Sequence, residues 1–440
     1  MAFQTPRLSP ASEPASEMLS MGLVALIPIT LLFYRLLYGP EPHLESSICR
    51  PAILSVCIAL YLASGRSWPT TNEQKLIGVF AILCSTLLVT SLLATNPARA
   101  MQEWVKLIVM CVIAVTLCRA LMNNTVATTF GTALVISSIG LGVLIVVTYV
   151  RYMGFTLPSY SATRVFKAAA MDESGLPLNP LAFECIFTFL SGMCLLRGRK
   201  VLCFLGGVLL LFSSALTGSR APLAVFTLSC LAFGVFQGLR SKAMLLRVVS
   251  IFLVLVLTAA GIVGVASVSP QQLSRITEGR SEIWSVAVHK FAIHPLWGNG
   301  YLSVEDDPTY IVGGYHNEYL TALAEQGLIG FAAVMYLFGS LLRRCYHLAI
   351  DPLSRNQNGQ LILFTCLFLM FRALVELPGL FGTAQGPADF LAYIFLAIAM
   401  SRTPDVEPQA APAQMRMSRP RFPAFCHARA GKFVSSEHPY

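Results

Sequence analysis

The sequence predicts an all-α polytopic membrane protein of about 12 transmembrane helices, with one long periplasmic loop that contains short helices. Two observations lead to this prediction. Of the 440 residues, 55% are hydrophobic and only 12% are charged, a balance that cannot cover a water-soluble surface. Apolar runs near the length of about 20 residues needed to cross a bilayer recur along almost the whole chain. These runs indicate one membrane unit over residues 18–402.

The expected spans are bounded by polar residues or by Gly and Pro. They cover 18–38, 51–64, 75–95, 103–122, 126–150, 179–196, 201–217, 221–239, 244–266, 316–342, 358–377 and 384–401. No small-residue cleavage site follows the polar segment 1–17, so we expect a cytoplasmic N-terminus and a retained first span. Residues 403–440, rich in Pro, Ala and Arg, are predicted to form a disordered cytoplasmic tail.

Basic residues concentrate in alternate connections between the spans. Short cytoplasmic loops carry an excess of Lys and Arg, so this alternation predicts that both termini are cytoplasmic. The connections contain Arg66, Lys75, Arg119, Arg197, Arg199, Lys200, Arg240, Lys242, Arg343 and Arg344. The net charge of +9 therefore reflects helix ends and does not indicate a nucleic-acid partner.

Cysteine and histidine spacing does not favour a metal centre. The twelve cysteines lie mostly in apolar runs without a CxxC or Cys/His pattern, as expected of packing residues. His289 and His294 are five residues apart with no third partner, which favours surface histidines. We expect no metal and no cofactor.

Three polar signals fall on the predicted periplasmic side. The first is the tight connection 217–222, in which Arg220 is expected at a helix start and Pro222 in the first turn. An arginine fork fits phosphate oxygens, and helix amide groups nearby add to the attraction. The alternative role for Arg220 is a lipid headgroup anchor.

The second signal lies in the long periplasmic loop, 267–315, which contains Arg275 and Arg280. The spacing of apolar residues over 281–291 predicts a short amphipathic helix near the membrane surface, with Arg280 at its start. Pro and Gly residues over 295–300 predict a turn after this helix. Long loops in compact membrane proteins are usually functional.

The third signal is His316-Asn317, which opens a strongly apolar helix. The positive end of the helix dipole disfavours a protonated histidine, and a neutral imidazole can accept a proton as a general base. A structural histidine followed by Asn317 as helix cap is the alternative. Gly327 and Gly330 are expected to permit close helix packing.

Charged residues also lie within or near the spans. Arg372 and Glu376 are spaced i to i+4 on one helix face, which suits either a structural ion pair or a contact with substrate. Glu103, Lys106 and Glu184 are the residues that a secondary transporter or flippase would use near the bilayer midplane. The polar signals above lie instead at the outer edge, which makes transport the weaker hypothesis.

The motifs resemble those of the O-antigen ligase and O-antigen polymerase superfamily, bacterial membrane glycosyltransferases that use lipid-carrier donors. The resemblance covers about residues 201–377 and rests on three motifs. They are His316-Asn317 followed by nine residues and Gly327-Leu328-Ile329-Gly330, Ser219-Arg220 at a helix start, and Gly279-Arg280-Ser281-Glu282-Ile283-Trp284 leading to Pro295-Leu296-Trp297-Gly298-Asn299-Gly300.

The resemblance implies a metal-independent glycosyltransferase of the bacterial inner membrane with a periplasmic active site. The donor would be a glycan on undecaprenyl diphosphate, with Arg220 and Arg280 on the diphosphate and His316 as the base for an inverting attack. Arg275, Asn317, Arg372 and Glu376 are further candidate substrate contacts. The acceptor would be lipid A core for a ligase, or a growing glycan for an O-antigen or exopolysaccharide polymerase; the motifs do not separate the two.

Overall fold

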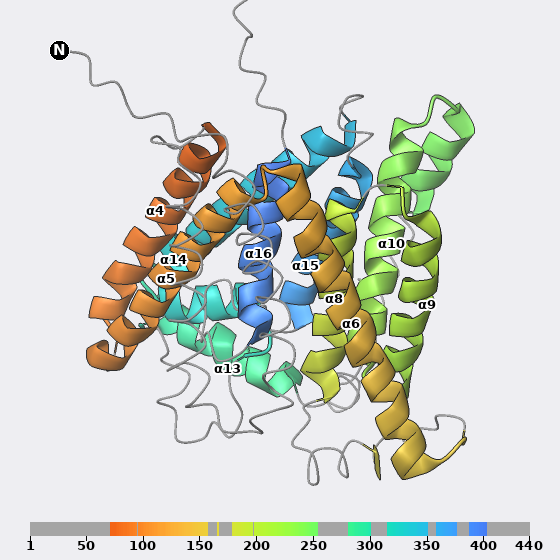
Figure 1. Cartoon of the computed structure of the whole chain (residues 1–440). Helices are drawn as coiled ribbons and strands as arrows, with labels where there is room; N and C mark the ends of the chain where they lie inside the picture. Colours follow the sequence, from red (N-terminus) through yellow and green to blue (C-terminus); the bar gives the residue numbers. More distant parts are fainter. Residues whose placement is uncertain are drawn as a thin grey trace, which may run out of the picture. The chain divides into compact units, whose positions relative to one another are not determined.

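The computed structural model describes residues 71–94, 96–156, 165–166, 178–196, 198–253, 280–300, 315–350, 358–375 and 387–402. These residues form α-helices and their connections, and the described ranges contain no β-strand (Figure 1). All of them lie in one compact unit that extends from Met1 to Thr403. The all-α prediction is confirmed for this part of the chain.

The described helices follow the expected apolar runs closely. They are α4 (Thr71–Leu92), α5 (Pro97–Ala120), α6 (Asn124–Met153), α8 (Leu178–Leu195), α9 (Lys200–Leu216), α10 (Arg220–Arg240), α13 (Arg280–Ile293), α14 (Glu318–Ile350), α15 (Gly359–Val375) and α16 (Pro387–Ser401). The expected spans 18–38 and 51–64, and the tail 403–440, lie outside the described residues.

Five of the described helices, α4, α5, α6, α10 and α14, are long and apolar enough to cross a membrane. The other apolar helices are shorter, with 10–17 residues in the described ranges. At a rise of about 1.5 Å per residue, the longest of these short helices falls slightly below a hydrocarbon core of about 30 Å. The expected total of about 12 spans is therefore not confirmed, although several membrane-crossing helices are.

Helices α8 and α16 lie at the centre of the described bundle. The residues of α8 from Leu181 onward and those of α16 from Leu391 onward are buried. Phe187 of α8 stacks on Phe368 of α15 with ring centroids 6.2 Å apart, and it meets Phe395 of α16 edge-on at 5.7 Å. These rings join α8 to α15 and α16 in one core.

Helices α6 and α8 approach each other closely through two glycines. A Cβ atom on Gly192 would lie 2.8 Å from the carbonyl oxygen of Gly131, and one on Gly131 would lie 2.9 Å from the carbonyl oxygen of Gly192. Small residues of this kind let membrane helices approach closely, since lipid supplies no hydrophobic driving force between them.

Contacts at the helix ends show how α8 and α15 run relative to each other. Asn358, before α15, donates from Nδ2 to the carbonyl oxygen of Met193 at 3.1 Å, near the end of α8. At the other end of α15, the guanidinium of Arg372 lies 5.4 Å from the ring centroid of Phe183, near the start of α8. Helices α8 and α15 are therefore antiparallel.

Helices α10 and α14 run in the same direction, opposite to α15. The Tyr319 hydroxyl at the start of α14 donates to the carbonyl oxygen of Met370, near the end of α15, at 3.2 Å. Arg240, the last residue of α10, donates from Nη1 to the carbonyl oxygen of Ala349 at 3.2 Å. The starts of α10 and α14 and the end of α15 thus share one end, near which Figure 1 shows α13. We call it the α13 end.

The opposite end gathers the basic residues that the sequence placed in alternate connections. Lys75, Arg343 and Arg344 line one cavity there, and Arg199 and Lys200 line another beside the start of α15. We call it the basic end. This segregation supports the predicted topology, but which end faces the cytoplasm stays a prediction.

The glycine crossing yields a stability prediction. We expect Gly192→Leu to lower the thermal stability of the detergent-purified protein, by an overpacking cost of about 1–3 kcal/mol, because Gly131 and its neighbours on α6 leave no room for a side chain. Gly207→Leu on α9 is the matched control, since a Cβ there meets no atom within 4 Å. Equal melting temperatures for the two variants would contradict the proposed crossing.

Candidate active site at the α13 end

Asn317 caps the start of α14. Its Oδ1 accepts hydrogen bonds from the backbone amides of Tyr319 and Leu320, both at 3.0 Å. Its carbonyl oxygen accepts from the amide and the hydroxyl of Thr321, each at 2.9 Å. Asn317 is thus the helix cap that the structural alternative for His316 included, and it satisfies amide groups that a helix start leaves without intrahelical partners.

His316 occupies a strained backbone position directly before this cap. Its φ of +49° lies in the left-handed region, which few residues other than glycine adopt. The side chain is half-buried. Strained non-glycine residues of this kind cluster at active sites, where the surrounding structure holds them in place.

The residue before His316 is held by α13. The indole Nε1 of Trp284 donates to the carbonyl oxygen of Tyr315 at 3.0 Å. Tyr315 is fully buried and packs in one cluster with Ala287 of α13 and Ala324 of α14. The backbone around His316 is therefore fixed on one side by α13 and on the other by the Asn317 cap.

Arg280 begins α13, as the sequence predicted, and links it to α15. Its Nη1 donates to the carbonyl oxygen of Val375, the last residue of α15. The side chain is half-buried. This bond ties the start of α13 to the end of α15.

Helix α14 is broken at Gly327, where φ is +64° and ψ is −163°. The turn after α13 closes the break with backbone hydrogen bonds. The amides of Leu328 and Ile329 donate to the carbonyl oxygens of Pro295 and Leu296, at 2.8 and 3.3 Å. These bonds satisfy amides at the start of the second half of α14.

The same turn also bonds the end of the first half of α14. The amides of Asn299 and Gly300 donate to the carbonyl oxygens of Ala324 and Glu325, both at 3.0 Å. The Asn299 side chain adds two bonds from Nδ2, to the carbonyl oxygens of Ala324 at 3.0 Å and Lys290 at 2.7 Å. The two motifs 295–300 and 324–329 thus form one interlocked unit.

Two glycines make this interlock sterically possible. A Cβ on Gly298 would collide with the backbone of Glu325, and one on Gly327 would collide with the backbone of Leu296. The expectation that Gly330 permits close packing with another helix is not met, because the space beside Gly330 holds the side chain of Gln326, from its own helix. Gly327 does permit a close approach, but to a turn and by breaking the helix.

Arg220 is the first residue of α10, and its side chain is exposed at the α13 end. The tight turn before it depends on Gly218, whose φ is +64°. In that turn the amide of Gly218 donates to the carbonyl oxygen of Ala215 at 3.0 Å, and the amide of Ser219 donates to Oγ1 of Thr217 at 3.2 Å. Pro222 lies in the first turn of α10, as predicted.

Three further residues were candidates for a contact with substrate: Arg372, Arg275 and Glu376. Arg372 is only 2% exposed and lies over the ring of Phe183, so in this structure it supports the packing of α15 on α8. A contact between Arg372 and substrate stays a prediction. Arg275 and Glu376 lie outside the described residues.

The sequence analysis assigned no role to three polar residues in the first half of α14. Glu318, Glu325 and Gln326 are at most 1% exposed. Burying a carboxylate or an amide costs free energy unless it has partners, so these residues indicate a polar interior behind His316. The signal was present in their spacing on an otherwise apolar helix.

The α13 end combines a histidine at a helix start with two arginines at helix starts. These are groups that can accept a proton and stabilise a phosphate anion. Among the described residues, no three His, Cys, Asp or Glu side chains are grouped as ligands for a metal ion.

Residues 205–335 match a family model described as O-antigen ligase. This family comprises membrane proteins of ligase and polymerase type that act on lipid-linked glycans. The matched region contains Arg220, Arg280 and His316, together with the interlock. No curated protein matches the chain significantly.

The interlock yields a prediction about local stability. We expect Asn299→Ala to remove two side-chain hydrogen bonds, worth about 1 kcal/mol each, and to speed hydrogen exchange at the amides of Leu328 and Ile329. Ser285→Ala is the control, because its exposed hydroxyl bonds only within α13, to the carbonyl oxygen of Glu282. Unchanged exchange in the Asn299 variant would show that the side chain does not hold the turn.

Proposed function

We propose, from the O-antigen ligase domain at residues 205–335, that this protein transfers a glycan from undecaprenyl diphosphate to lipid A core at the periplasmic face of the inner membrane. The strained, doubly anchored position of His316 beside the start of α14 is the observation that carries the proposal. An imidazole held in this way is positioned to act as a base without having to be ordered during the reaction.

In the proposed reaction, His316 removes the proton from the acceptor hydroxyl as the oxygen attacks the anomeric carbon of the donor. The bond from that carbon to the diphosphate oxygen breaks, and undecaprenyl diphosphate leaves with the bonding electron pair. Attack opposite to the leaving group inverts the anomeric configuration. Arg220 and Arg280 stabilise the negative charge that develops on the diphosphate.

Three features support this division of roles. Arg220 is exposed at a helix start, where an arginine and nearby amide groups attract phosphate. Arg280 is held at one nitrogen by the carbonyl oxygen of Val375. Asn317 is occupied as a helix cap, so its proposed part is to position His316 and not to contact the substrate.

A polymerase that extends O-antigen or exopolysaccharide is the second candidate, because the matched family covers both types. It would use the same donor and the same three residues. Only the acceptor differs, since a polymerase adds to a second lipid-linked glycan. The experiment must therefore offer both acceptors.

Transport without chemistry has less support. An interrupted helix can serve a transporter by presenting free backbone groups to an ion or substrate. The break in α14 is different, because the turn 295–300 bonds the amides of Leu328 and Ile329 and the carbonyl oxygens of Ala324 and Glu325. The ion pair of Glu103 with Lys106 lies within one helix and is only partly buried.

The test of the base uses purified protein in liposomes that contain undecaprenyl-diphosphate glycan and lipid A core. We expect the wild type to transfer glycan to core and His316→Asn to lose at least about 100-fold in rate while it still binds donor. Asparagine tolerates the left-handed backbone at this position but cannot act as a base.

The matched control is His289→Asn, the same change at an exposed histidine of α13. Extension of the donor with no transfer to core would identify a polymerase. If neither product formed, the transporter hypothesis would be favoured instead. A His316 variant as active as the control would remove His316 from the mechanism.

The diphosphate role is tested by a change that keeps the charge. We expect Arg220→Lys to weaken donor binding by roughly tenfold or more, because lysine lacks the planar fork that bonds two phosphate oxygens at once. Arg151→Lys, at an exposed arginine in the last turn of α6, is the control. Equal donor affinity in both variants would assign Arg220 to headgroup anchoring instead.

A further inference from the structure

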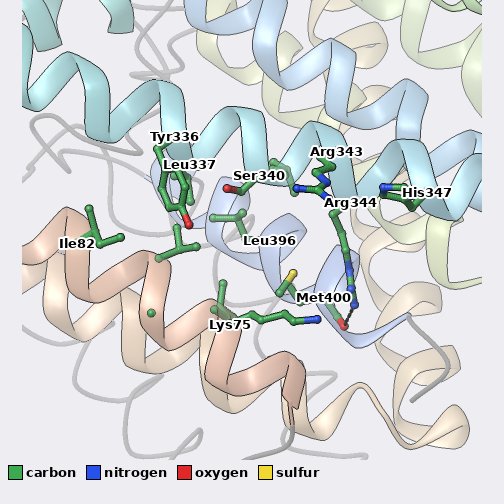
Figure 2. Close-up of a pocket in the computed structure, with 14 residues that line it drawn as sticks. Lys75, Ile82, Tyr336, Leu337, Ser340, Arg343, Arg344, His347, Leu396 and Met400 are labelled. Carbon is green, nitrogen blue, oxygen red and sulfur yellow. Dashed lines mark hydrogen bonds between the residues drawn. The ribbon is translucent and has the colours of Figure 1, made fainter. Parts of the chain in front are cut away.

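A cavity of about 630 Å³ opens between α4, α14 and α16 at the basic end. Figure 2 shows its two halves. Lys75 of α4 and the side chains of Arg343, Arg344 and His347 of α14 gather on one side, while Ile82, Tyr336 and Leu337 lie on the other. The cavity therefore combines a cationic mouth with a largely apolar wall, and its volume lies within the range of about 300–1,000 Å³ that is common for ligand pockets.

Two of the basic side chains at the mouth are open to solvent. Lys75 and Arg343 are exposed, and neither forms an ion pair with any residue that the structure describes. Glu73, the acidic residue in the first turn of α4, is buried, and its Oε1 lies 4.0 Å from Nε of Arg119. The Glu73 carboxylate therefore faces Arg119 in the interior of the bundle.

The basic side chains at the mouth come from two helices. Arg344 of α14 donates from Nη2 to the carbonyl oxygen of Met400 at 3.3 Å, which holds α14 against α16. Lys75 of α4 and Arg343 of α14 line the same cavity, so an anion that enters the mouth meets positive charge from both helices.

We infer that this cavity binds an anionic phospholipid. The phosphate lies between Lys75 and Arg343, at the depth of the helix ends, and an acyl chain runs down the apolar wall formed by Ile82 and Leu337. Basic pockets between transmembrane helices on the cytoplasmic side suit such headgroups. A free phosphate ion would match the mouth but would leave the apolar wall uncovered, so the wall favours a membrane lipid.

This site lies at the opposite end of the bundle from His316 and is independent of the proposed transfer reaction. The test is the retention of lipid by the full-length protein in detergent, measured by native mass spectrometry with phosphatidylglycerol and with zwitterionic phosphatidylcholine. We expect wild type to retain phosphatidylglycerol more tightly, and the double variant Lys75→Gln, Arg343→Gln to lose about thirtyfold in affinity at low salt, about fivefold for each charge.

A matched double variant controls for the loss of charge. Lys242→Gln with Arg247→Gln removes two exposed basic residues just beyond the end of α10, outside the cavity, and is expected to retain the lipid as the wild type does. An equal loss of lipid in this control would overturn the proposal, because it would show attraction to the basic end as a whole.

A second variant fills the cavity without changing charge. Gly78 lines the cavity, and a Cβ there meets no atom within 4 Å, so Gly78→Leu fits the fold and places a side chain where the lipid would lie. We expect it to lose phosphatidylglycerol, whereas Gly234→Leu, at an equally open glycine of α10, keeps it. Retention by the Gly78 variant, or equal retention of free glycerol phosphate by the wild type, would overturn the lipid assignment.

Discussion

The break in α14 at Gly327 takes backbone amide and carbonyl groups away from their partners within the helix. A backbone group of this kind that is buried without a hydrogen-bond partner costs several kcal/mol. The turn 295–300 meets this requirement with backbone bonds to both halves of the helix, and Asn299 reinforces it with its side chain. The broken helix and the turn therefore depend on each other, and the rest of the candidate site is built on that pair.

Helix α13 is placed by the same interlock because it leads directly into the turn. With its end attached to the break in α14, its start reaches the end of α15, where Arg280 bonds the carbonyl oxygen of Val375. Between these points Trp284 holds the carbonyl oxygen of Tyr315 and so fixes the residue before His316. The strained backbone of His316 persists because the residues on both sides of it are held in place by hydrogen bonds.

Arginines serve different purposes in this bundle according to their depth and partners. Arg119 faces Glu73 inside the bundle, and Arg372 lies buried over the ring of Phe183, so both contribute to packing. Arg220 is exposed at a helix start, and Arg343 is exposed at the mouth of a cavity at the opposite end. An exposed guanidinium group can be reached by an anion from outside, whereas a buried one is enclosed by the helices that it holds together.

The sequence by itself determined the features that depend on local patterns. Apolar runs predicted most of the described helices, and local signals predicted the start of α13 at Arg280 and Pro222 in the first turn of α10. These succeed because helix formation and capping involve residues within one or two turns of each other. The predicted number of spans was not confirmed, because several apolar helices in the described ranges are shorter than a bilayer is thick.

Only the tertiary structure decided how these pieces meet. The backbone bonds that join the turn 295–300 to α14 link residues 25 or 33 positions apart, and every sequence carries the same backbone groups. The burial of Arg372 over Phe183 depends likewise on the neighbouring helix α8. The hydrogen bond from Arg280 to the carbonyl oxygen of Val375 depends on the position of α15. A pattern along one chain segment records what that segment prefers, whereas these contacts depend on the partner that folding brings to it.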